Sequence, residues 1–82
     1  MTPTEAINAI CEALDHAAAQ YLSDTPAGVA RWLRGETQPW PMDRDERDLM
    51  IEILADITEE TDDVTTLAAL AALTAGFRRV AC

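Results

Sequence analysis

The chain contains no Lys, one His and two Cys, and only 5% of its 82 residues are aromatic. General acid–base and nucleophilic catalysis draw largely on His, Lys and Cys, so few candidate catalytic groups are present. Cys11 and Cys82 lie far apart and outside any Cys-x-x-Cys or Cys/His spacing typical of metal sites or disulfide frameworks. We therefore expect no enzyme activity, no cofactor and no metal site.

The sequence also lacks an apolar run of the roughly 18–20 residues that span a bilayer, and no positively charged leader precedes an apolar segment. A cytoplasmic protein without membrane contact is therefore expected. Six Arg oppose 15 Asp and Glu, which gives a formal net charge of −9 at pH 7. That charge opposes binding to other polyanions. The length predicts one domain over residues 1–82.

Apolar residues recur at intervals of three and four along the chain, which predicts an all-α fold. Each expected helix start combines a capping residue with Pro at the first helical position, with Glu three residues later, or with acids in the first turn. These starts are Thr2, Thr25, Asp43 and Thr61.

The middle of the chain leaves one boundary open. Residues 16–22 form either a second short helix capped by Asp15 or the end of one continuous first helix, because no Gly or Pro separates them. The helix that follows Thr25 should end at Gly35, where a left-handed cap costs least. Residues 38–41 contain two Pro and predict a loop with Trp40 as its anchor.

Residues 19–35 read A-Q-Y-L-S-D-T-P-A-G-V-A-R-W-L-R-G, a short helix, a turn of about four residues and a second short helix stopped by Gly. In this interpretation the small Ala19 lets the two helices cross closely. Val29 and Trp32 point into the core, and Leu22 fills the space between them. The segment is therefore predicted to be a helix-turn-helix.

This pattern resembles the helix-turn-helix domain of phage repressors and Cro proteins, often called the XRE family. The resemblance rests on A-x-x-L, on the Thr-initiated helix after it, and on V-x-x-W-L-x-G followed by a Pro-containing loop into an apolar helix. It covers roughly residues 5–58. The resemblance implies a compact five-helix bundle, a lambda-repressor-like fold, whose third helix enters the major groove of DNA as a homodimer on two half-sites. The implied function is a small sequence-specific transcriptional regulator of phage or plasmid origin.

The outward face of the predicted recognition helix carries the candidate DNA contacts. Direct readout falls mainly to Arg31, because the Pro, Ala and Gly early in this helix cannot hydrogen-bond a base edge. Arg34 and the residues after it are better placed for phosphates. The candidate contacts are Thr25, Ala27, Gly28, Arg31, Arg34, Thr37 and Gln38, with His16 and Gln20 as further phosphate candidates.

Residues 62–82 are predicted to form a C-terminal helix used for dimerisation. Large apolar residues recur there at three and four with Ala between them, so the outer side of this helix would show mostly Ala. Homodimerisation would bury that surface at roughly 25 cal/mol per Å². The alternative is a helix packed wholly within its own bundle. The predicted dimer contacts are Leu67, Leu70, Leu73, Phe77 and Val80.

A second interpretation keeps the scaffold and changes the partner. Residues 43–60 hold eight acids and two Arg, so this helix either presents a solvated face or binds a basic protein surface. The protein would then be an acidic interaction module, such as an antitoxin, an inhibitor or a DNA mimic. Arg31 and Arg34 would be solvated or paired with acids, and His16 would be solvated.

Overall fold

The computed structural model describes residues 2–80, with the side chain of residue 80 excepted. These residues form four helices, α1 (Pro3–Tyr21), α2 (Thr25–Leu33), α3 (Arg44–Glu59) and α4 (Val64–Val80), and no strand. The all-α prediction is confirmed. The five-helix prediction is wrong, because residues 16–21 continue α1 instead of forming a separate helix.

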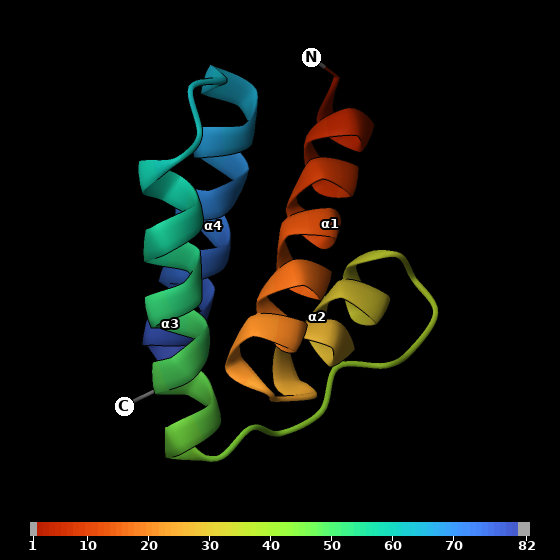
Figure 1. Ribbon diagram of the computed structural model, residues 1–82, viewed down its shortest axis with the longest axis vertical. Helices are drawn as coiled ribbons and strands as arrows, with labels where there is room; N and C mark the ends of the chain where they lie inside the picture. The colour runs from red at the N-terminus through yellow and green to blue at the C-terminus, as the bar shows by residue number, and fades with distance from the viewer. Residues whose placement is uncertain (1, 81–82) are drawn as a thin grey trace.

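The chain runs down α1, turns sharply into α2, and returns through a long loop to α3 (Figure 1). α3 and α4 lie side by side in opposite directions and are joined by a short connection, while α2 crosses the lower part of α1 (Figure 1). Within residues 2–80, none of the helices combines the length and the apolar character needed to cross a membrane.

Two predicted capping boxes are confirmed at the starts of α1 and α3. The Thr2 hydroxyl accepts the backbone N–H of Glu5 at 3.2 Å, and the Glu5 carboxylate accepts the N–H of Thr2 at 3.0 Å. Asp43 and Glu46 make the same pair of bonds at 2.8 and 3.2 Å. Each box satisfies two backbone donors that a helix start leaves without partners.

The end of α2 is also as predicted. Gly35 adopts a left-handed conformation, with φ of 80°. Its N–H donates to the carbonyl of Trp32, and the N–H of Glu36 donates to the carbonyl of Arg31, both at 2.9 Å. These two bonds form a Schellman motif, which ends the helix and directs the chain into the loop.

The cap of α4 differs from the prediction by two residues. Asp63, not Thr61, precedes the first helical residue, and its carboxylate accepts the N–H of Thr66 at 2.8 Å and the Thr66 hydroxyl at 3.0 Å. The backbone hydrogen bond is the main reason that the pKa of Asp63 lies below its usual value. Thr61 instead donates its hydroxyl to the carbonyl of Ile57 at 2.7 Å, at the end of the preceding helix.

The core forms where all four helices meet. Leu70 of α4 is completely buried and Phe77 is 9% exposed, so both pack inside their own chain and offer almost no surface to a second copy. This corrects their assignment as dimer contacts. The side chain of Val80, a further predicted contact, lies outside the described residues. The buried cluster consists of Ile10, Cys11, Leu14, Ala17, Val29, Ala30, Met50, Ile53, Leu54, Leu70 and Phe77.

The prediction that Leu22 fills the space between Val29 and Trp32 is wrong, because the residue is 93% exposed. Because α1 continues through Tyr21, Leu22 becomes the left-handed residue that ends the helix, with φ of 53° and ψ of 44°. The N–H of Ser23 closes the turn by donating to the carbonyl of Ala18 at 3.1 Å. A branched side chain in this conformation is strained, since its Cβ crowds the following carbonyl.

We expect Leu22→Gly to raise the free energy of unfolding by about 0.5–1 kcal/mol, because relief of left-handed strain exceeds the added chain entropy of Gly. Urea denaturation followed by circular dichroism measures this change. Leu22→Ala is the matched control, since it removes the same exposed side chain and keeps the Cβ. Equal stability of the Gly and Ala variants would show that the left-handed turn carries no strain.

Candidate functional site

The structure separates the predicted DNA contacts by exposure. The accessible ones lie late in α2 and in the loop after it, while the early ones are covered by other parts of the chain. Arg31, Arg34, Thr37 and Gln38 are exposed, Thr25 and Ala27 are partly buried, and Gly28 is buried.

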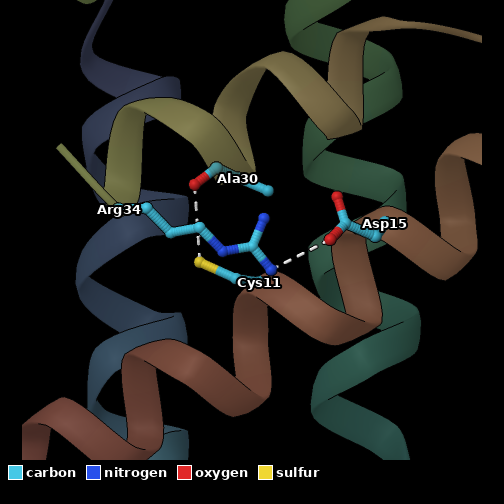
Figure 2. A network of polar contacts seen from close by, with 4 residues as sticks. All are labelled: Cys11, Asp15, Ala30 and Arg34. Atoms are coloured by element: carbon cyan, nitrogen blue, oxygen red, sulfur yellow. Dashed lines mark hydrogen bonds and ion pairs between the residues drawn. The ribbon is translucent and has the colours of Figure 1, made fainter. Parts of the chain in front are cut away.

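Arg34 faces a carboxylate of α1. Its Nη2 lies 2.9 Å from Oδ2 of Asp15, in an ion pair whose side chains remain 32% and 46% exposed (Figure 2). The hydrogen bond from this guanidinium to Asp15 raises the pKa of Arg34 above its usual value. An exposed ion pair of this kind is weak, so a phosphate can compete for the guanidinium. The neighbouring carboxylate nevertheless reduces the attraction of this guanidinium for a phosphate.

The start of α2 also has acids beside it. The Thr25 hydroxyl donates to Oε2 of Glu46 in α3 at 3.3 Å, and Asp24 occupies the N-cap position without making a capping hydrogen bond. A helix N-terminus attracts anions through its free N–H groups and its dipole. Here the protein's own carboxylates already lie at that end, which weakens any attraction for a DNA phosphate.

Trp40 covers α2 at Gly28. A Cβ added to Gly28 would lie 2.7 Å from Cη2 of Trp40, too close for two carbon atoms in contact. Gly28 therefore provides room for the indole of the same chain, and its predicted role as a DNA contact is corrected. The interpretation of Trp40 as the anchor of its loop agrees with this position.

The loop after α2 encloses an apolar hollow of about 330 Å³ against α3 and α4, here called the tryptophan hollow. Arg47 is its one charged lining residue. The sequence indicated an anchoring role for Trp40 but gave no sign of the hollow, because the hollow exists only after the loop folds back over α4. Its main apolar residues are Trp32, Trp40, Met42, Leu73 and Phe77.

A second hollow, here called the α1–α3 groove, measures about 510 Å³ and lies between α1 and α3. It contains both further phosphate candidates, His16 and Gln20. Four carboxylates line the same groove, so a phosphate would meet strong repulsion there. The carboxylates belong to Glu12, Asp56, Glu59 and Glu60.

Tyr21 connects the two walls of the α1–α3 groove. Its hydroxyl donates to Oδ2 of Asp56 at 2.9 Å, joining the end of α1 to α3. This hydrogen bond is the main cause of the raised pKa of Tyr21. The two residues are 35 positions apart, and nothing in the local sequence pattern signals their contact.

Cys11 is completely buried, and its thiol donates to the carbonyl of Ala30 at 3.5 Å (Figure 2). Burial raises the pKa of Cys11, which keeps the thiol protonated and a poor nucleophile. Cys82 lies outside the described residues. Within the part of the chain that the structure describes, no three His, Cys, Asp or Glu side chains are grouped so that they could hold a metal ion.

The outer face of α4 is formed by small side chains. Ala68, Ala71, Ala72 and Ala75 are exposed, and Leu67 and Leu73 are partly buried on either side of them. α4 contains no Asp or Glu, in contrast to the acidic helices α1 and α3. Among the predicted dimer contacts whose side chains the structure describes, Leu67 and Leu73 are partly exposed and could still contact a second copy.

Comparison with protein-family models, with curated proteins and with solved structures finds no match for this chain.

We expect Gly28→Ala to lower the free energy of unfolding by about 1–3 kcal/mol, the usual cost of an overpacked contact. Displacement of Trp40 should also shift the tryptophan emission to longer wavelength. The matched control is Gly76→Ala in α4, where the added Cβ meets nothing within 4 Å. Because Ala is the better helix former, this control should gain about 0.5–1 kcal/mol. A stable Gly28→Ala variant with unchanged emission would contradict the packing of Trp40 on α2.

Proposed function

We propose that the protein is an acidic helical interaction module that binds a basic surface of another protein. The observation that carries this proposal is the position of the chain's own carboxylates beside α2. Asp15 pairs with Arg34, and Glu46 accepts the Thr25 hydroxyl. Carboxylates therefore lie near both ends of the helix that would have to contact DNA, where they repel a phosphate backbone.

The balance of charges supports the same partner class. Each phosphate contact contributes a slope of about −0.9 to the dependence of log affinity on log salt, and strong DNA binders make about 6–10 such contacts. With Arg34 paired to Asp15, α2 retains only Arg31 as a cation without an ion pair among the described residues. By contrast, a net charge of −9 accelerates encounter with a cationic protein.

A DNA-binding regulator is the second candidate function. It is favoured by the exposure of Arg31 near the end of α2 and of Thr37 and Gln38 in the following loop. In this candidate, α2 would lie in the major groove and Arg31 would contact a guanine edge. Both candidates need no cofactor, and one titration separates them.

We also propose that two copies associate through the outer face of α4. Its exposed Ala side chains allow close approach of a second helix, and the absence of acids there removes the repulsion that the rest of the surface imposes. Arg78 and Arg79 lie in the last turn of α4, whereas Asp62 and Asp63 precede its first turn. An antiparallel pair would place these opposite charges next to one another.

We expect no measurable binding to a DNA duplex of about 20 base pairs at about 0.05 M salt, and saturable binding to a cationic amphipathic peptide of about 16 residues, because the exposed charge is mainly negative. Fluorescence anisotropy of labelled DNA and labelled peptide measures both. The DNA arm has a matched pair of variants, Arg31→Ala and Arg44→Ala. Salt-sensitive DNA binding that is lost only in Arg31→Ala would reverse the order of the two candidates.

We expect the protein to have the mass of two chains at micromolar concentration, and Ala75→Glu to reduce it to one chain by placing charge in the α4 contact. Light scattering after gel filtration measures the mass. Ala19→Glu, an equal change on the exposed side of α1, should leave the dimer intact. A mass of one chain for the unaltered protein would exclude this association.

A further inference from the structure

The α1–α3 groove combines an apolar floor with acidic walls. Ala9, Ala13 and Ala17 repeat every four residues on one face of α1, and Ile53 and Ile57 face them from α3. Ala17 is 7% exposed and Ile53 is 1% exposed, so these two belong to the bottom of the groove. The small Ala side chains leave the space of about 510 Å³ open to a ligand.

Carboxylates stand on both sides of this floor. Glu12 belongs to α1, Asp56 and Glu59 belong to α3, and Glu60 follows α3 directly. Among the described residues that line the groove there is no Arg, and His16 is the one basic side chain. A ligand that fits this arrangement has an apolar stripe with positive charges on both flanks.

We propose that the α1–α3 groove binds a cationic amphipathic helix of a partner protein. Such a helix places apolar residues at i, i+3, i+4 and i+7 on one face, with Arg or Lys on either side of them. The α1 wall from Ala9 to Gln20 is about 16 Å long, which matches about three helical turns. This inference rests on the proposed function, since it specifies where and how the basic partner binds.

The tryptophan hollow fits this ligand less well. It is smaller, and its one charged lining residue is the cation Arg47. It offers no carboxylate to the flanks of a basic helix. The hollow is useful as a reporter, because both Trp32 and Trp40 line it and neither lines the α1–α3 groove.

The first test blocks the floor. We expect Ala13→Gln to weaken binding of a Leu/Lys amphipathic peptide of about 16 residues by about tenfold or more, because the longer side chain occupies the site of an apolar anchor. Ala19→Gln is the control, since Ala19 is exposed on α1 outside the groove, and it should change affinity by less than about twofold. A scrambled peptide of equal composition, which lacks the apolar stripe, should bind at least about tenfold more weakly.

The second test removes negative charge from the walls of the groove and leaves its apolar floor unaltered. It remains informative if the Ala13→Gln variant does not fold. Glu12→Gln with Glu59→Gln should weaken peptide binding and flatten its salt dependence. Asp24→Asn with Glu36→Gln raises the net charge by the same amount on exposed residues outside the groove, and it should retain most of the affinity. Spermine is a polycation without an apolar face. When it is added at the same concentration of positive charge as the peptide, it should fail to displace the peptide.

The outcomes separate the groove from the broader function. If the unaltered protein binds no cationic peptide, both the proposed function and this site are wrong. Suppose that the protein binds the peptide, but that the groove charge variant binds it as well as the control charge variant and Ala13→Gln binds it as well as Ala19→Gln. Only the assignment of the site to the groove is then overturned. A shift of tryptophan emission on peptide binding, together with unchanged affinity of the Ala13→Gln variant, would move the site to the tryptophan hollow.

Discussion

The crossing of α2 over α1 determines where the residues of the predicted DNA-contacting segment lie. At this crossing Ala30 and Cys11 are both completely buried, and the thiol donates to the Ala30 carbonyl. Small side chains at both positions permit the close approach. One helical turn farther along each helix lie Arg34 and Asp15, so the ion pair follows directly from this packing register (Figure 2). The same crossing places α2 where the indole of Trp40 can rest on Gly28.

The distribution of charge gives this packing its functional meaning. Acids on α1 and α3 face one another across the α1–α3 groove, while the cations of α4 lie in its last turn. The acids of α1 and α3 repel each other across the groove. The hydrogen bond between Tyr21 and Asp56 is one of the contacts that hold these two helices together. A basic ligand would reduce that repulsion, which is a physical reason for such a groove to prefer cationic partners.

Much of the local structure could be predicted from the sequence, because caps and turn residues act over three or four positions. The boxes at Thr2 and Asp43, the left-handed Gly35 and the Pro-containing loop are examples. The continuity of α1 could not be decided in this way. Asp15 is an acceptable capping residue and an acceptable helix-interior residue, so the local sequence does not distinguish the two. The groove was equally inaccessible, since its walls come from segments more than 30 residues apart.

The helix boundary at Asp15 also determines which charge lies beside Arg34. If a new helix began there, the Asp15 carboxylate would cap it by accepting a backbone N–H one turn ahead, and Arg34 would keep its full attraction for phosphate. Because α1 instead continues to Tyr21, that carboxylate points from the helix surface toward the guanidinium. Continuity of α1 also displaces Leu22 from the core and brings His16 and Gln20 to the acidic groove. Under the proposed function, this one helix boundary is what places a carboxylate beside Arg34 and makes the charge near α2 less suited to a phosphate backbone.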